Sequence, residues 1–268
     1  MIQLNGASRV YLIVGDPIAQ VKSPAGVTDT FQKNGMNALV IPAHVSPSDF
    51  HDFAQVIAKA QNFDGIVVTV PHKFAAYDIC NQYSERSSFL KAVNVIKRSS
   101  SGGWYGDMCD GAGFYAAAQK NGGSVKGKKA LVVGAGGAGS AIAHTLLVEG
   151  ASELAIHDED QVRCHSLIEK LASLHLGTVR AGTSDPSGFD FVVNATPIGM
   201  KESDSVPIKT EFLSPDAFVG DVITMPAITK LIEQARAKGC ATVTGTEMFA
   251  GVKDLMIDFL ISKQLKVE

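Results

Sequence analysis

Short apolar runs alternate along the chain with longer stretches in which apolar residues recur at helical spacing. In the first half, strands are predicted at 10–15, 38–45, 65–70 and 92–97, and helices at 24–34, 48–61 and 73–81. Such alternation is typical of α/β proteins, in which helices connect parallel strands. The first half is therefore predicted to form an α/β domain with a parallel sheet.

The alternation starts again after a glycine- and lysine-rich turn, NGGSVKGKK (121–129), which is typical of a domain boundary. Further strands are predicted at 129–134, 153–158, 178–182, 189–195, 218–223 and 240–245, and a last helix at 247–262 has no strand after it. A chain of 268 residues has the length of two domains. We expect a first domain of residues 1–108 with 246–268, a second of 109–245, and a cleft between them.

Composition and charge exclude several classes of protein. The net charge is −3 and basic residues cluster only in pairs, which argues against a nucleic-acid surface. The four cysteines are far apart without a C-x-x-C pattern, so we expect a reducing cytoplasm rather than a disulfide framework or zinc site. The N-terminal apolar run is too short for a signal peptide, and glycines in 130–148 argue against a membrane span. We expect a monomer or homodimer without nucleic-acid or membrane partners.

A glycine-rich turn joins the first strand of the second half to a helix. It fits the pattern G-x-G-x-x-G, whose glycines permit a tight turn, close approach of a pyrophosphate, and packing of helix on strand. Asp158 ends the next strand, where a carboxylate binds ribose hydroxyls. The second domain is therefore predicted to be a Rossmann domain. The expected cofactor-binding residues are Gly134, Ala135, Gly136, Gly137, Ala138, Gly139, His157, Asp158, Asn194, Thr196 and Val222.

The strand end HDED (157–160) bears on the choice of dinucleotide. It sets three carboxylates and no arginine where the 2′-phosphate of NADP would lie, so Coulomb repulsion favours NAD. Arg163 is close in sequence and keeps NADP as the alternative. His157, Asp158 and His165 could instead be metal ligands, but ribose binding explains the position of Asp158 better. We therefore expect no metal.

A hydride-carrying cofactor requires a group that moves a proton to or from the substrate oxygen. None of the five tyrosines has a lysine four residues on, and no zinc-ligand spacing occurs. The candidates are Lys73, which follows the apolar run VVTVP, and the aspartates of GDMCDG (106–111). Of these aspartates, Asp107 is expected to be a loop carboxylate. A lysine at a strand end is ordinarily a solvated charge, so its role depends on its neighbours.

Several motifs in a fixed order resemble those of the shikimate/quinate dehydrogenase family. The usual patterns GxPIxHSxSP, NVTVPxK, AVNT, GDNTDG, GAGGA and NATxxG correspond here to GDPIAQVKSP, VVTVPHK, AVNV, GDMCDG, GAGGAG and NATPIG. The resemblance covers essentially the whole chain. It implies a substrate domain followed by a Rossmann domain, and an NAD(P)-dependent oxidoreductase acting on a cyclic hydroxy acid related to shikimate or quinate.

The same resemblance assigns roles to individual residues. It makes Lys73 the group that relays the proton and Asp110 the carboxylate that orients Lys73 and binds the same hydroxyl. It implies that Asn94 hydrogen-bonds another ring hydroxyl, that Ser23 binds the substrate carboxylate, and that Thr69 lines the pocket.

The departures from the family patterns lie in the substrate pocket. Apolar or smaller residues replace polar ones at Val21, Val67, Met108, Cys109, Thr224 and Val252. Each lost hydrogen bond is worth ~0.5–1.5 kcal/mol, so weak binding of shikimate is expected. His72 lies at a position that the family varies and is expected to be a bystander.

Two alternatives stay open. The chain could be a non-catalytic sensor that binds the dinucleotide and has a degenerate substrate pocket; retention of both Lys73 and Asp110 speaks against it. It could also be another two-domain, lysine-dependent enzyme such as a methylenetetrahydrofolate dehydrogenase, which would lack the GDxxDG element.

Overall fold

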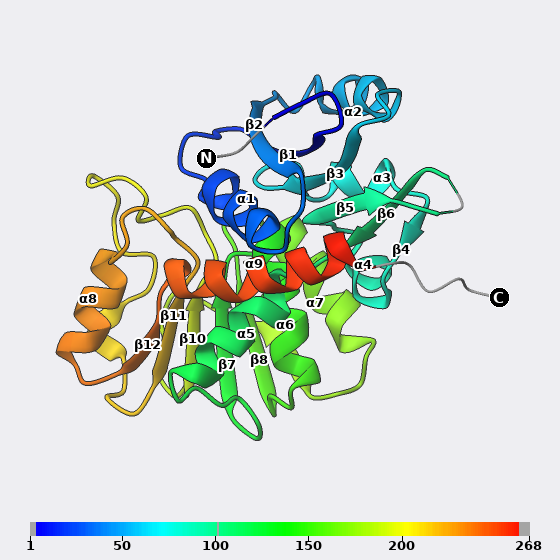
Figure 1. Ribbon diagram of the computed structural model, residues 1–268. Coiled ribbons are helices and arrows are strands. Elements are labelled where there is room, and N and C mark those ends of the chain that lie inside the picture. Colours follow the sequence, from blue (N-terminus) through cyan, green and yellow to red (C-terminus); the bar gives the residue numbers. More distant parts are fainter. Residues whose placement is uncertain (1–3, 101, 263–268) are drawn as a thin grey trace. The chain divides into compact units, whose positions relative to one another are not determined.

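The computed structural model describes residues 4–100 and 102–262. The chain divides into two compact units, Met1–Cys109 with Lys253–Glu268 (unit 1) and Asp110–Val252 (unit 2). The domain boundaries expected from the sequence lie after residues 108 and 245, and the unit boundaries in the structure lie after residues 109 and 252. Each unit has its own sheet, blue to cyan-green in unit 1 and green to orange in unit 2 (Figure 1).

The last helix, α9 (Gly245–Ile261), is shared between the units. Its first residues, 245–252, belong to unit 2, whereas the sequence analysis placed the helix with the first domain. Close packing explains the difference. A Cβ on Gly251 would lie 2.5 Å from the carbonyl oxygen of Gly113 in α5 (Asp110–Lys120), so the absence of a side chain lets the two helix backbones meet.

The described part of unit 1 forms a six-stranded sheet in the order β2-β1-β3-β5-β6-β4. Its strands are β1 (Arg9–Gly15), β2 (Ala38–His44), β3 (Phe63–Val68), β4 (Gln82–Tyr83), β5 (Val95–Arg98) and β6 (Trp104–Asp107). β2, β1 and β3 are parallel, but β5 is antiparallel to both β3 and β6. The prediction of a parallel sheet is therefore wrong for this unit. Gly102 and Gly103, both with positive φ, let the chain reverse between β5 and β6.

The helices of unit 1 connect these strands and cover the sheet. They are α1 (Ser23–Lys33), α2 (Phe50–Ala58), α3 (Ala75–Asp78) and α4 (Glu85–Leu90). Alternate residues of a strand point to the same face. Leu12 and Val14 of β1 and Ile66 and Val68 of β3 accordingly enter one apolar cluster, together with Trp104 of β6.

Unit 2 contains a parallel sheet in the order β12-β11-β10-β7-β8-β9. Its strands are β7 (Lys129–Val133), β8 (Glu153–His157), β9 (Thr178–Ala181), β10 (Phe191–Asn194), β11 (Phe218–Asp221) and β12 (Ala241–Val243). Its other helices are α6 (Gly137–Val148), α7 (Gln161–Ala172), the short η1 (Thr210–Phe212) and α8 (Lys230–Ala237). The order reverses between β7 and β10, as in a Rossmann fold, and ligands bind such sheets at that point.

The tight packing of Gly65 in β3 yields a stability prediction. A Cβ there would lie 2.6 Å from the carbonyl oxygen of Ile96 and 2.9 Å from Leu260 Cδ2. Because a backbone oxygen cannot move aside, Gly65→Ala should destabilise unit 1 by ~1–3 kcal/mol. The single tryptophan, Trp104, is buried in unit 1, so its fluorescence in a urea titration reports this unit.

Gly6→Ala is the matched control, because no atom lies within 4 Å of a Cβ at that position. Its urea midpoint should equal that of the wild type. Equal midpoints for the two alanine variants would contradict the packing account.

Candidate functional site

The carboxyl edge of the unit 1 sheet collects several of the predicted substrate-site residues. β3 and β6 end at this edge, and β5 begins there because it runs antiparallel to both. The backbone N–H of Val68 donates to the carbonyl of Asn94 at 2.7 Å, and the N–H of Asn94 donates to the carbonyl of Asp107 at 2.9 Å. Asn94, predicted inside a strand, in fact precedes β5. Thr69, Asn94 and Asp107 therefore lie on neighbouring backbone segments.

Lys73 is held on the loop that follows β3. Its carbonyl accepts the N–H of Val93 at 2.8 Å, one residue before Asn94. On the other side, the N–H of His72 donates to the carbonyl of Thr69 at 3.0 Å. The backbone that carries Lys73 is therefore tied to both Thr69 and the segment that carries Asn94.

The side chain of His72 also fastens this loop. The ring is 1% exposed, stacks on Phe50 with 4.6 Å between centroids, and places Nε2 2.8 Å from the carbonyl oxygen of Val45. Burial lowers the pKa of His72, against the opposing effects of the Val45 bond and the charge of Asp16. A neutral imidazole that donates from Nε2 fits this environment. No sequence pattern predicts this contact, because it joins residues 27 apart.

Ser23 begins α1 and is 3% exposed. No side chain caps the helix at Lys22, and none of the described residues hydrogen-bonds the Ser23 hydroxyl. An uncapped helix N-terminus presents N–H groups and a positive dipole to an anion. This arrangement suits a carboxylate. Val21 is half-buried two residues earlier, while Val67 is buried within β3.

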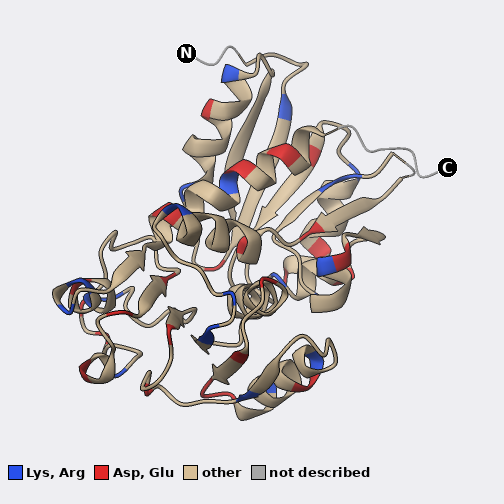
Figure 2. Cartoon of the chain, turned by 90° about the horizontal axis from the view of Figure 1, so that it is seen from below, with Lys and Arg blue, Asp and Glu red and all other residues tan. Residues whose placement is uncertain are grey.

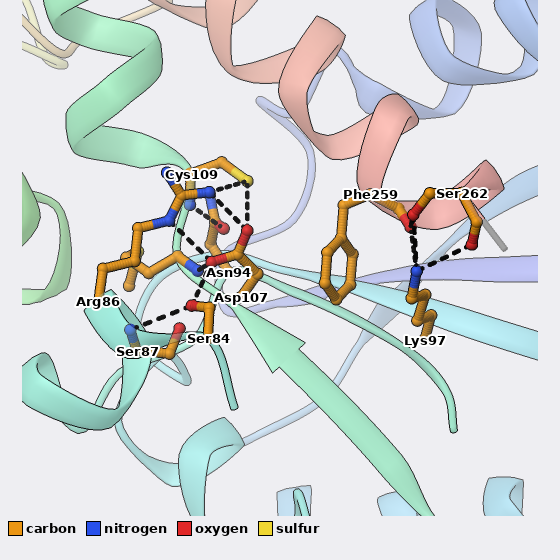
Figure 3. A network of polar contacts seen from close by, with 10 residues as sticks. Ser84, Arg86, Ser87, Asn94, Lys97, Asp107, Cys109, Phe259 and Ser262 are labelled. Atoms are coloured by element: carbon orange, nitrogen blue, oxygen red, sulfur yellow. Dashed lines mark hydrogen bonds and ion pairs between the residues drawn. The ribbon is translucent and has the colours of Figure 1, made fainter. Parts of the chain in front are cut away.

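A polar network surrounds Asp107 at the same edge (Figure 3). Arg86 of α4 donates from Nε to Oδ1 at 2.8 Å and from its terminal nitrogen to Oδ2 at 2.5 Å, and Ser84 donates to Oδ1. Burial by itself would raise the pKa of Asp107, but the hydrogen bonds and charge of Arg86 outweigh it and leave the pKa below its ordinary value. The N–H of Cys109 donates to Oδ1 of Asn94 at 2.8 Å.

Lys97 is a second buried charge in unit 1 (Figure 3). Its Nζ donates to the carbonyls of Phe259 and Ser262 at 2.7 and 3.0 Å, where α9 ends. Burial lowers the pKa of Lys97, while the charge of Asp107 opposes that change. The ammonium group thus satisfies carbonyls that a helix C-terminus leaves without intrahelical partners.

In unit 2, the geometry of the glycine turn between β7 and α6 shows whether a dinucleotide would fit there. A Cβ on Gly139 would lie 1.9 Å from the carbonyl oxygen of Gly134, so helix and strand meet there. At Gly136 no atom lies within 4 Å of such a Cβ, which leaves open space beside the backbone. No side chain caps α6 at Gly136. The turn has the features that a pyrophosphate requires.

Asp158 follows β8 and closes the other side of this turn. Its Oδ2 accepts the N–H of Ala135 at 2.6 Å and its Oδ1 accepts the N–H of Asp160 at 2.8 Å. The guanidinium of Arg163 lies 4.0 Å from Asp158 and 3.2 Å from Asp160. One cation thus faces the carboxylates of residues 158–160, which leaves this corner acidic.

At the carboxyl ends of β10 and β11, Asp221 organises the loops. It accepts hydrogen bonds from Asn194 Nδ2 at 3.1 Å, the N–H of Ile223 at 3.1 Å and the hydroxyl of Thr229 at 2.7 Å. Asn194 Oδ1 in turn accepts the N–H and hydroxyl of Thr196 at 3.0 and 2.7 Å. Burial raises the pKa of Asp221 to about 6 despite these bonds. Two predicted cofactor residues, Asn194 and Thr196, therefore shape this loop.

Several predicted roles are not decided by these contacts. Lys73 and Asp110 belong to different units, and their pairing stays a prediction, as does the role of Val252, which is buried. Thr224 and Val222 follow β11 in unit 2 and are half-buried. Arg86 and Asp221 were not among the predicted site residues, because their partners lie far away along the chain and their neighbours in sequence form no motif.

The rest of the surface is mixed in charge. In the view of Figure 2, Lys and Arg are interspersed with Asp and Glu. Residues 4–100 and 102–262 contain no group of three or more His, Cys, Asp or Glu placed to hold a metal ion. All four cysteines are buried, and none of them forms a disulfide bond. No helix in the described residues is long and apolar enough to cross a membrane; 130–148 forms β7 and α6 instead.

A parallel sheet with this strand order, a glycine turn at its switch point and a carboxylate after the next strand define a dinucleotide-dependent α/β protein. Comparisons with known proteins agree. The model for the shikimate dehydrogenase substrate binding domain matches residues 13–96. A shikimate dehydrogenase (NADP(+)) of Rubrobacter xylanophilus is 32% identical over 252 residues, covering 92% of this chain and 88% of the relative.

Solved structures extend the comparison to the whole fold. The ligand-free 5-ketofructose reductase of Gluconobacter sp. strain CHM43 has a TM-score of 0.83 and 28% identity, covering 97% of this chain and 95% of its own. Quinate dehydrogenase from Corynebacterium glutamicum, in complex with NAD, has a TM-score of 0.83 and 26% identity, covering 95% and 94%. The chain belongs to the shikimate/quinate dehydrogenase family of NAD(P)-dependent oxidoreductases, which confirms the resemblance in its motifs.

Asp221 yields a pH prediction. Its folded pKa of about 6 exceeds the ordinary value, so the folded protein keeps a proton that the unfolded chain releases. The stabilisation is complete below pH ~4 and is lost as the pH rises through ~6, by up to ~3 kcal/mol. Asp221→Asn removes this titration. The free energy of unfolding of the variant minus that of the wild type should therefore rise between pH 4 and 7.

Urea titrations followed by far-UV circular dichroism measure this difference at each pH. Asp216→Asn, an exposed position in the same unit, controls for the loss of one carboxylate. A difference for Asp221→Asn that stays constant from pH 4 to 7 would show that Asp221 does not titrate in this range.

Proposed function

We propose that this protein is a dehydrogenase that transfers hydride between a nicotinamide cofactor, preferably NAD, and the hydroxyl or ketone of a cyclic hydroxy acid related to shikimate or quinate. The observation that carries the proposal is the backbone network that ties Lys73 to Thr69 and to the segment bearing Asn94. It brings a proton-transferring group and polar groups for a substrate to one edge of the unit 1 sheet.

The chain's own residues would divide the work as follows. When bound at the glycine turn, the dinucleotide supplies or accepts the hydride. Lys73 accepts the hydroxyl proton during oxidation and returns one to the oxygen during reduction, with Asp110 orienting the ammonium group. Asn94 and Thr69 bind ring oxygens, and Ser23 with the N-terminus of α1 binds the carboxylate. Together, these contacts would hold the reacting oxygen of the substrate near Lys73.

The substrate is proposed to differ from shikimate in its polar groups. Family patterns place polar side chains where this chain has Val21, Val67 and Val252, and both Val67 and Val252 are buried. Unpaired hydroxyls of a bound ligand would lie against these apolar groups, which costs ~1–3 kcal/mol for each buried group. A less hydroxylated ring that keeps its carboxylate fits this site better.

A keto sugar is the second candidate substrate. It is supported by the likeness to 5-ketofructose reductase, which is 28% identical to this chain over nearly its full length. Against it stands the unpartnered Ser23 hydroxyl at the start of α1, because a neutral sugar has no carboxylate to place there.

Turnover tests the proposal. A panel of cyclic hydroxy acids and keto sugars, assayed by absorbance of the reduced cofactor, should show activity with an acid and a kcat/KM for shikimate well below ~10⁶ M⁻¹s⁻¹. Lys73→Met should lower kcat by ~10²–10⁴, the usual contribution of general acid–base catalysis. Its affinity for the dinucleotide should not change.

Lys33→Met, at an exposed position in the last turn of α1, is the matched control for loss of a lysine. It should retain full activity. If wild type turns over nothing in the panel, the non-catalytic sensor replaces the enzyme; activity of Lys73→Met equal to wild type would remove Lys73 from the chemistry.

Cofactor binding gives a separate prediction. If the carboxylates of residues 158–160 lie beside the ribose as proposed, NADH should bind ~10-fold more tightly than NADPH, since ~1–2 kcal/mol of repulsion opposes the extra phosphate. Gly136→Val should fold as the wild type does, because a Cβ there meets no atom within 4 Å, yet should lose both dinucleotides.

Fluorescence titration of NADH and NADPH measures the binding, and far-UV circular dichroism the folding. Gly139→Ala is the contrasting variant: its Cβ overlaps the carbonyl of Gly134, so it should lower stability as well as binding. Equal affinity for the two cofactors would contradict the preference for NAD.

A further inference from the structure

We propose that the Arg86–Asp107 ion pair is a positioning element of the substrate site, which fixes Asn94 as a hydrogen-bond donor and so selects a substrate oxygen that can accept. This inference rests on the proposed function and specifies the polarity of one substrate contact. Figure 3 shows the residues that carry it.

The orientation of the Asn94 amide follows from one contact. Oδ1 of Asn94 lies 2.8 Å from the backbone nitrogen of Cys109. A backbone N–H can only donate, so the side-chain atom that meets it must be the carbonyl oxygen. The other end of the amide is then Nδ2, which has donors and no acceptor. Any ligand atom that Asn94 binds through Nδ2 is therefore an acceptor, such as a hydroxyl or ketone oxygen.

The position of the Cys109 N–H depends on the turn formed by residues 107–109. Oδ1 of Asp107 accepts the N–H of Met108 at 2.7 Å, which ties the carboxylate to the backbone of this segment. The Asn94 N–H, in turn, donates to the Asp107 carbonyl at 2.9 Å. Asn94 and the turn therefore hold each other through both backbone and side chain.

Arg86 fixes the carboxylate on which this turn depends. It binds both oxygens of Asp107, and its terminal nitrogen also lies 3.6 Å from the thiol of Cys109. The bidentate geometry prevents rotation of the carboxylate, which a single contact would allow. Ser84 reinforces it: its hydroxyl donates to Asp107 and accepts the N–H of Ser87, so the start of α4 is joined to the turn.

Within residues 4–100 and 102–262, Arg86 is the cation that forms an ion pair with Asp107. Lys97, the neighbouring buried charge, has its Nζ bonded to the carbonyls of Phe259 and Ser262 at the end of α9. Loss of Arg86 would leave Asp107 buried without its bidentate partner, and the turn could then relax.

The test combines four variants with two measurements. Arg86→Met removes the ion pair with Asp107. Arg86→Lys keeps the positive charge but cannot form the bidentate contact. Asn94→Asp replaces the Nδ2 donor with an acceptor oxygen. Ser87→Ala is the matched control, because the buried Ser87 hydroxyl has no partner among the described residues. Amide hydrogen exchange of Cys109, read by NMR, reports the turn. Shikimate titrated at saturating NAD⁺ gives KM and kcat.

We expect Arg86→Met to speed exchange of the Cys109 N–H at least ~10-fold and to raise KM by ~10-fold or more, with dinucleotide affinity unchanged. Arg86→Lys should recover part of both effects. Asn94→Asp should raise KM similarly while Cys109 stays protected, since Oδ1 remains. Ser87→Ala should match the wild type in both measurements.

Each other outcome counts against a defined part of the proposal. Unchanged exchange and KM in folded Arg86→Met, with folding checked by Trp104 fluorescence, would reduce the pair to a structural role. Should that variant not fold, Arg86→Lys decides the same point. Binding by Asn94→Asp as tight as wild type would refute the donor assignment. Absence of turnover by the wild type with shikimate and with every other acid of the panel would instead refute the proposed function, and the exchange measurement would still decide whether Arg86 holds the turn.

Discussion

The antiparallel return of β5 and β6 is the constraint on which the unit 1 site depends. In a purely parallel sheet, each strand would contribute only its carboxyl end to this edge. Because β5 runs in the opposite direction, the residue before it, Asn94, reaches the edge where β3 delivers Thr69 and β6 delivers Asp107. The hydrogen bonds between these backbone segments hold them without any ligand. The site is therefore organised by strand direction before any side-chain chemistry is considered.

The pKa values of two buried aspartates, one in each unit, are shifted in opposite directions. Burial raises the pKa of both carboxyls, but for Asp107 the bidentate contact with Arg86 reverses the effect. Asp221 has only neutral donors, from Asn194, Thr229 and backbone N–H groups, and its pKa stays raised at about 6. A guanidinium compensates for desolvation where hydroxyl and amide donors do so only in part. Asp107 thus keeps its charge to lower pH than an ordinary aspartate, whereas Asp221 has a pKa raised to about 6.

Sequence reasoning found the parts of the fold that local pattern determines. The G-x-G-x-x-G turn with Asp158 indicated the Rossmann sheet, because turn, strand and helix are adjacent in sequence, and the ordered motifs indicated the family. The direction of β5 could not be predicted, since an apolar run reads the same in either direction. The contacts of His72, Arg86 and Asp221 could not be predicted for a related reason: their partners, Val45, Asp107 and Asn194, are 21 to 27 residues away. Contacts between distant segments leave no periodic signal.

The departures of this chain from the family motifs include particular hydrogen-bonding positions, and that pattern bears on specificity. The valines at positions 21, 67 and 252 are proposed to leave ring hydroxyls without partners, while Ser23, Thr69 and Asn94 keep the polar groups proposed to bind the carboxylate and ring oxygens. A site with fewer partners discriminates by rejecting what it cannot pair, because a buried hydroxyl against valine loses its bond to water and gains nothing. With Asn94 held as a donor, the retained contacts favour an acceptor oxygen beside Lys73. Relaxed affinity for shikimate and a defined orientation of the reacting oxygen are therefore compatible in one site.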